Sequence, residues 1–157
     1  MDKIWAPWRI NYFKIKKQKG CIFCKAKKNN AGDYVIFKSK HCLGLLNIYP
    51  YACGHIMIAP LRHINSLGQL NQQEVMDIFA ALKKIQLALD KVLKPQGYNI
   101  GLNLSRSSGA GITGHMHIHI VPRWIGDANF MTTISDTRVI SQSLGQLRKE
   151  LLKYVRP

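Results

Sequence analysis

The sequence predicts an α+β fold in which an antiparallel sheet of about five strands is covered by helices on one side. Three observations support this prediction: short apolar runs separated by turn residues come first, one long amphipathic pattern follows, and further strands lead to a second amphipathic pattern near the end. At 157 residues the chain can build one real core but is too short for two ordinary domains. Residues 1–157 are therefore expected to form a single domain.

The first strands are predicted from short apolar runs. Residues 34–37 (YVIF) and 43–48 form two such runs, separated by a polar turn. Residues 55–59 form a third run after the turn at 50–54, and Pro60 is expected to stop it. Because short connections join antiparallel strands, these runs are expected to pair as antiparallel neighbours.

The clearest helix is predicted from residue 72 to about residue 94. Asn71 is a suitable N-cap, and Glu74 stands three residues later, as in a capping box. Pro95 and Gly97 are expected to end the helix. Its apolar residues recur every three to four positions and predict one buried stripe, formed by Val75, Ile78, Phe79, Leu82, Ile85, Leu89, Val92 and Leu93.

The last third of the chain is predicted to add two strands and a helix. Residues 98–104 form one strand, a glycine-containing loop follows at 105–114, and residues 115–119 form the next strand. A terminal helix from about residue 141 would bury Leu144, Leu147, Leu151 and Val155.

Composition narrows the class of protein. No apolar stretch is long enough to span a membrane, and the start lacks the pattern of a signal peptide, so a cytoplasmic location is expected. The cysteines are then expected to be thiols, with Cys42 and Cys53 as small buried apolar residues. Lys and Arg number 23 against 8 Asp and Glu, and the resulting charge of +15 favours a polyanionic partner without choosing one.

The run HMHIHIVPRW, residues 115–124, places three histidines at alternate positions. In an extended strand alternate side chains share one face, so His115, His117 and His119 are predicted to point together. A lone histidine on a strand is typical of a structural residue, whereas three in register indicate a functional site. A three-histidine metal site is an alternative, because imidazole is a common zinc ligand.

The run from His115 to Val121 resembles the signature of the histidine triad (HIT) family, whose members act on nucleoside phosphates. The resemblance covers nearly the whole chain and points to the bacterial branch that contains diadenosine tetraphosphate phosphorylases and hydrolases. It rests on WAPWR near the start, GHIMIAPLRH at 54–63, GLNL and GAGI within 101–112, and PRWIGDANFM at 122–131. It implies a HIT-like fold with one long central helix and a C-terminal helix, and a homodimer whose sheets join across a two-fold axis.

The resemblance also implies a mechanism, in which His117 attacks the α-phosphorus of a nucleotide and forms a covalent nucleotidyl-histidine. Neutral imidazole is a competent nucleophile near neutral pH, and the phosphoramidate remains reactive enough to be broken again. His119 would donate a hydrogen bond to the α-phosphate oxygens, and His55 would join the network from the neighbouring strand. The expected substrates are dinucleoside polyphosphates or nucleoside phosphoramidates. Water as second acceptor gives a hydrolase, and inorganic phosphate gives a phosphorylase.

The loop before the histidines is the predicted phosphate-binding segment, because glycines let backbone amides approach anionic oxygen and serines add hydroxyl donors. Ser105 stands where this branch is expected to carry glycine, and Gly111 lies near a glutamine of animal members that contacts the leaving phosphate. Because of these two departures, the sequence does not decide whether water or inorganic phosphate is the second acceptor. Two asparagines stand at family positions near the ribose and the phosphates. With them, the predicted nucleotide-binding residues are Asn47, Asn103, Ser107, Ser108, Gly109 and Gly111.

The motif CIFC places Cys21 and Cys24 at a spacing that lets both thiolates reach one metal ion. Two further ligands are needed, and two buried structural cysteines would explain the motif equally well. The resemblance supplies the missing ligands, because zinc-containing members add histidines that correspond to His63 and His115. It therefore implies a structural zinc, with His115 holding one end of the strand so that His117 is aimed correctly.

Three readings of the function remain: the enzyme with His117 as nucleophile, metal-dependent hydrolysis with His115, His117 and His119 as ligands of one ion, and a module without catalysis. The alternative to an enzyme is a zinc-stapled module that binds nucleotides or nucleic acid without catalysis, and the charge of +15 is its main support. The resemblance favours the enzyme, with a nucleotide and a second copy of the chain as partners and with neither nucleic acid nor a membrane. The aromatic residues expected to fill the core or the dimer interface are Trp5, Trp8, Trp124 and Phe130.

Overall fold

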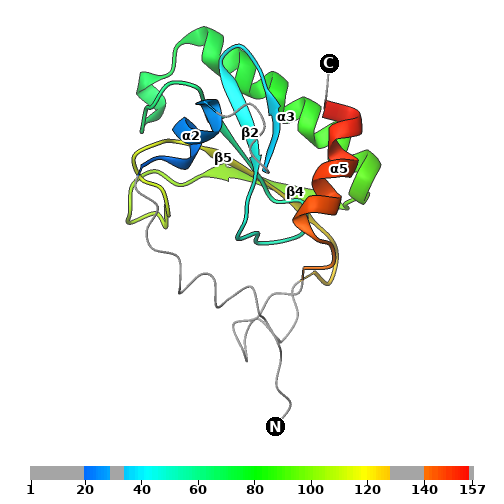
Figure 1. Cartoon of the computed structure of the whole chain (residues 1–157). Coiled ribbons are helices and arrows are strands. Elements are labelled where there is room, and N and C mark those ends of the chain that lie inside the picture. Colours follow the sequence, from blue (N-terminus) through cyan, green and yellow to red (C-terminus); the bar gives the residue numbers. More distant parts are fainter. Residues whose placement is uncertain (1–19, 29–33, 128–139, 156–157) are drawn as a thin grey trace.

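The computed structural model describes residues 20–28, 34–127 and 140–155. Trp5, Trp8 and Phe130, for which core or interface positions are predicted, lie outside these residues, as does the WAPWR motif. Figure 1 shows the long helix α3 (Gln72–Leu93) against the sheet, with α5 (Leu144–Val155) near one end of α3. The short helix α2 (Ile22–Lys28) lies on the other side of the picture.

A five-stranded sheet forms the centre of the fold and confirms the predicted fold class. Its strands lie in the order β1-β2-β3-β5-β4, and every pair of neighbours is antiparallel. The edges of the sheet are therefore β1 and β4. The strands are β1 (Val35–Lys38), β2 (Cys42–Leu46), β3 (Ile56–Pro60), β4 (Gly97–Leu102) and β5 (Ile118–Arg123).

The ends of the first four strands differ by one or two residues from the predicted ones. Pro60, expected to stop β3, is instead its last residue and lies opposite Cys42 of β2. Proline is tolerated there because the strand does not continue beyond it. A short 3-10 helix (Leu67–Gln69) then leads into α3.

The prediction that residues 115–119 form a regular strand is wrong in part, because β5 begins only at Ile118. On one side the pairing stops because β4 ends there: Leu102, its last residue, lies opposite Ile118. On the other side β3 continues two residues beyond Ile58, the partner of Ile118, but its last residue, Pro60, has no N–H to donate. The N–H of Met116 bonds instead to the carbonyl of Ile64, at 2.7 Å. His115 and His117 are therefore held by loop contacts rather than by the ladder.

The predicted capping box of α3 is confirmed, since Asn71 and Glu74 each bond to the other's backbone N–H. The predicted buried stripe is wrong at two positions, because Val75 is 37% exposed and Phe79 is 64% exposed. Small residues take their place on the buried side and let the helix lie close to the sheet. The buried residues of α3 are Glu74, Ile78, Ala81, Leu82, Ile85, Ala88 and Leu89.

Helices cover both faces of the sheet, and not one face as predicted. Alternate strand residues such as Ile56 and Ile58 pack with α3 and α5 in one apolar cluster. Their neighbours Met57 and Ala59 form a second cluster with Phe23 of α2 on the opposite face. The terminal helix begins at residue 144 rather than 141, and it buries Leu147, Leu151 and Val155 but leaves Leu144 half-buried.

Within the described residues, no helix combines the length and the apolar character that a bilayer-spanning segment requires.

Candidate active site and metal centre

The histidines of the HMHIH motif lie on the sheet face that carries α2. Because Ile118 and Ile120 belong to the cluster under α3, the alternation of β5 turns His119 to the other face, where it lies opposite Met57. The ring centroids of His117 and His119 are 4.8 Å apart. His55, from the turn before β3, continues this row with a centroid 5.0 Å from that of His119.

A backbone carbonyl determines the protonation site of His117. The Nδ1 atom lies 2.9 Å from the carbonyl oxygen of His115, which only accepts, so Nδ1 carries the proton and donates it. Burial lowers the pKa of the His117 imidazole, so the ring is neutral at neutral pH. The unprotonated lone pair is therefore on Nε2. The residue as a whole is only 3% exposed.

A chain of hydrogen bonds determines the protonation site of His119 in the same way. The backbone N–H of Tyr51 donates to Nδ1 of His55 at 3.1 Å, and the Asn47 amide donates to the same atom at 3.2 Å. The proton of neutral His55 is therefore on Nε2, which donates to Nδ1 of His119 at 2.8 Å. His119 in turn carries its own proton on Nε2. Burial first, and the neighbouring His117 second, lower the pKa of His119 to about 4.

Two residues of the turn before β3 support this chain, and only one of them is predicted from the sequence. Asn47, predicted to bind nucleotide, accepts a hydrogen bond from the Tyr49 N–H, which orients its amide so that the NH2 group faces His55. The ring of Tyr51 also packs on His55 and His119, with centroids 4.5 and 5.8 Å away. Tyr51 is not predicted, because only the folded turn brings its ring to the histidines.

The glycine-containing loop joins β4 to β5 but makes no hydrogen bond to His117 or His119 within the described part of the chain. Ser108 donates its hydroxyl to the carbonyls of Leu104 and Ser105, which closes the loop on itself. Ser107 shares a hydrogen bond with Ser105 at 3.0 Å. The predicted phosphate-binding residues Ser107, Ser108, Gly109 and Gly111 are exposed, and Asn103 is half-buried.

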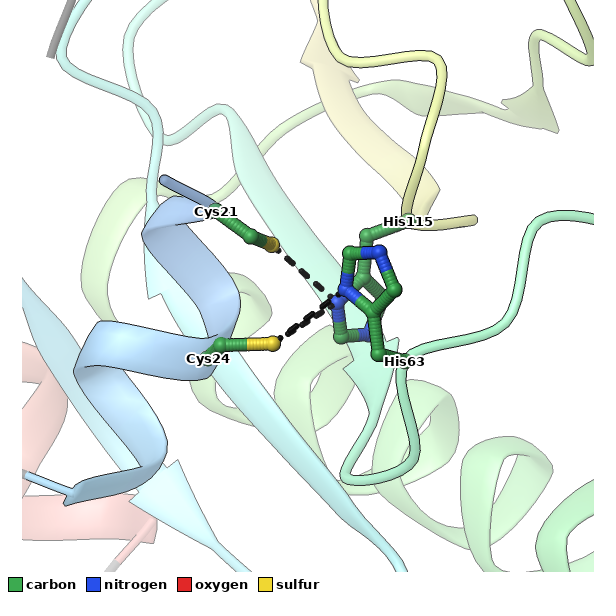
Figure 2. A group of neighbouring side chains, drawn as sticks. All are labelled: Cys21, Cys24, His63 and His115. Atoms are coloured by element: carbon green, nitrogen blue, oxygen red, sulfur yellow. Dashed lines mark hydrogen bonds between the residues drawn. The ribbon is translucent and has the colours of Figure 1, made fainter. Parts of the chain in front are cut away.

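The residues predicted to bind zinc converge on one point. The Sγ atoms of Cys21 and Cys24 and one ring nitrogen from each of His63 and His115 all lie within 4.8 Å of one another. Figure 2 shows Cys24 on α2 and Cys21 directly before it, with both sulfur atoms facing the two imidazoles. Cys21 Sγ lies 3.2 Å from His115 Nδ1, and Cys24 Sγ lies 3.3 Å from His63 Nδ1.

The donor set fits a tetrahedral metal ion. A zinc ion with ordinary Zn–S and Zn–N bonds holds its sulfur and nitrogen ligands about 3.6 Å apart, close to the distances found here. The protonation of His115 matches this role. Its Nε2 donates to the carbonyl of Pro60 at 2.9 Å, so Nδ1 is unprotonated and its lone pair faces the cysteines. Within the described residues this is the one group of three or more such side chains that could hold a metal ion, so an ion shared by the three HMHIH histidines is not supported.

An ion pair anchors the segment that carries His63. Arg62 donates from Nε and Nη2 to both carboxylate oxygens of Glu74, each at 2.7 Å. Glu74 is 2% exposed, and the Arg62 guanidinium holds the pKa of its carboxyl below the usual value. Glu74, which belongs to the capping box of α3, thereby holds the residue next to His63 in place.

One cavity, of about 390 Å³, lies between β1, α3 and α5. It includes Lys84 and Arg148 but none of the histidines or cysteines described above. The candidate site is thus on the opposite side of the sheet from this cavity.

Comparison with known proteins gives consistent results. The family model described as "HIT domain" matches residues 28–124. The chain is 34% identical over 161 residues to a protein of Mycobacterium tuberculosis named AP-4-A phosphorylase, covering 96% of this chain and 83% of that protein. It is 30% identical over 92 residues to the asymmetrical bis(5'-nucleosyl)-tetraphosphatase of Schizosaccharomyces pombe, covering 59% and 50% of the two chains. The crystal structure of a Zn-bound histidine triad family protein from Mycobacterium smegmatis superposes with a TM-score of 0.69, at 26% identity over 86% of this chain and 92% of that one.

Proposed function

The chain belongs to the histidine triad (HIT) family, and from this membership we propose that it is an enzyme that cleaves dinucleoside polyphosphates or related nucleotides at the α-phosphate through a covalent nucleotidyl-histidine. The relatives named as a phosphorylase and as a tetraphosphatase support the substrate class. The observation that carries the proposed chemistry is the bond from His117 Nδ1 to the His115 carbonyl, which leaves Nε2 as a nucleophile.

In the first step, Nε2 of His117 attacks the α-phosphorus, and the bond from phosphorus to the bridging oxygen breaks. The leaving nucleoside polyphosphate departs with the electron pair on that oxygen. The imidazole then carries a positive charge, and the hydrogen bond from Nδ1–H to the His115 carbonyl stabilises it. In the second step, water or inorganic phosphate attacks the phosphorus, the N–P bond breaks and the lone pair returns to Nε2.

His119 is the proposed donor to the α-phosphate. Because its proton is on Nε2, it can donate to a non-bridging oxygen on which negative charge increases in the transition state. His55 holds His119 in that protonation state. We assign nucleotide contacts to the loop between β4 and β5 and to two asparagines, that is to Ser107, Ser108, Gly109, Gly111, Asn47 and Asn103.

We further propose that Cys21, Cys24, His63 and His115 bind a structural zinc ion. The fit of the four donor atoms supports this assignment, as does the Zn-bound relative from Mycobacterium smegmatis. Zinc there would supply a cross-link between α2 and the segment before β5, and no step of the reaction passes through it.

Two further properties belong to the same proposal. We expect a homodimer formed through β4, because this edge strand exposes unpaired backbone groups and its Ile100 is 49% exposed. We also expect the protein in the cytoplasm, since the four cysteines of the described residues are free thiols and two of them face histidines.

Trapping the intermediate tests the proposal. Diadenosine tetraphosphate labelled at the α-phosphate should leave a base-stable, acid-labile label on the protein, and His117→Asn should abolish it. Product analysis then identifies the second acceptor: AMP and ATP in water, or ADP and ATP when inorganic phosphate is present. A wild-type protein that neither becomes labelled nor turns over this substrate or a nucleoside phosphoramidate would show that the proposal is wrong.

A further inference from the structure

Phe23 lies where the metal-ligand cluster meets the histidine row. It stands between Cys21 and Cys24 on α2, and its side chain is fully buried. Its ring centroid is 5.1 Å from that of His115 and 5.0 Å from that of His117. The motif that contains it predicts a role for the two cysteines only.

The surroundings of Phe23 are apolar and buried. Its ring rests on one apolar cluster of the sheet, formed by Val35, Leu43, Leu45, Met57 and Ala59. The helix that carries it has seven residues, which is too short to be stable alone. The position of α2 therefore depends on packing and on the contacts of Cys24 and of the preceding Cys21 with His63 and His115.

The His117 ring needs support of this kind. Among the described residues the ring makes one hydrogen bond, from Nδ1 to the His115 carbonyl, and this bond restrains one edge of the ring. Rotation about the Cβ–Cγ bond would break that bond and turn Nε2 away from its direction. The Phe23 ring, inclined at 36° to the His117 ring, occupies the space beside it and opposes this rotation.

We propose that Phe23 is a positioning residue, which packs against the rings of His115 and His117 and holds the His117 imidazole in the orientation that its reaction requires. The inference rests on the proposed function of His117 as nucleophile. It also makes the Cys/His cluster part of the support of that nucleophile, because Phe23 and Cys24 lie on the same short helix and Cys21 directly precedes it.

The test compares Phe23→Leu with Leu43→Val. Both changes remove a small amount of buried apolar volume from the same cluster, but Leu43 lies on β2, which β3 separates from β5 and its histidines. In Phe23→Leu, single-turnover labelling of the protein by α-labelled diadenosine tetraphosphate should slow by about tenfold, because small misplacements of reacting groups are costly. KM should stay within about twofold, and labelling by Leu43→Val should match the wild type.

A spectroscopic measurement separates this inference from the proposed function. In wild-type protein, 15N NMR of the imidazole nitrogens should report a single protonated Nδ1 at His117, and Phe23→Leu should give a mixture of Nδ1–H and Nε2–H forms. Phe23→Met offers the same comparison if the leucine variant does not fold. An unchanged His117 spectrum in these variants, or an equal loss of labelling in Leu43→Val, would overturn the role of Phe23. Absence of labelling in the wild type would instead contradict the proposed function, and the spectra would still test Phe23.

Discussion

The carbonyl oxygen of His115 lies 2.9 Å from Nδ1 of His117, so the backbone of one histidine fixes the proton of the next. The ring of His115 takes part in a different group, with Nδ1 facing Cys21 and Nε2–H bonded to Pro60. One residue therefore belongs both to the Cys/His cluster and to the support of the proposed nucleophile. A change in the Cys/His cluster is therefore expected to affect His117 through His115.

Loss of one cysteine should test this link. Cys24→Ser removes the thiol that lies 3.3 Å from His63 and 3.7 Å from His115. We expect the bound zinc to fall from about one per chain to almost none, with a lower Tm and slower labelling of His117. Elemental analysis and thermal unfolding measure these effects. Cys53→Ser, which changes a buried thiol outside the cluster, is the control and should keep the metal. Full zinc content in Cys24→Ser would contradict the assignment.

Removal of the proposed phosphate donor should slow the chemical step. His119→Phe keeps a ring in place but has no N–H, and loss of one such donor typically lowers kcat by about 10²–10³-fold. KM should change much less, because the donor acts mainly on the transition state. His119→Asn retains an amide donor and should recover part of the rate. Single-turnover labelling measures all three proteins, and equal rates in His119→Phe and the wild type would show that His119 is not the donor.

Local patterns of the sequence predict the fold more reliably than the contacts of the site. The capping box of Asn71 and Glu74 is a local motif, and it forms as predicted. The buried face of α3 also depends on what the helix packs against, which explains why Phe79 is exposed although its spacing fits the stripe. The family resemblance is needed to predict that the four metal-ligand candidates lie together, since the spacing of Cys21 and Cys24 supplies only two of the four ligands.

The residues missed in the sequence, Phe23 and Tyr51, make contacts that no sequence pattern marks. Phe23 meets His115 and His117 from a helix more than ninety positions away along the chain, and no periodic pattern marks it. Tyr51 acts on His55 mainly through its backbone N–H, which any residue but proline would offer. Contacts of this kind depend on tertiary structure, and only coordinates identify them.

Stability should fall on acidification because partial burial favours the neutral form of His119 in the folded protein. Its pKa is about 4 in the folded protein, below the ordinary value of 6.5 that the unfolded chain retains. Between these two pKa values the unfolded state binds more protons than the folded state, so the free energy of unfolding decreases as the pH falls from about 6.5 towards about 4. Above about pH 6.5 the stability that His119 contributes is fully present. Urea unfolding near pH 7.5 and near pH 5 measures the change. His119→Phe should reduce the pH dependence, and an identical dependence in that variant would assign the effect to other groups.

Glycine at position 105 should stabilise the loop between β4 and β5. Ser105 has φ +70°, in the left-handed region where an L-residue with a Cβ atom costs about 1–2 kcal/mol. Ser105→Gly relieves this strain at the loss of one exposed hydrogen bond to Ser107, and the greater freedom of glycine in the unfolded chain offsets part of the gain. We expect a net increase of about 0.5–1 kcal/mol in the free energy of unfolding, measured in urea. Ser107→Gly is the matched control, because its backbone is not left-handed, and it should lower stability. A gain in the control equal to that of Ser105→Gly would mean that backbone strain at position 105 is not the cause.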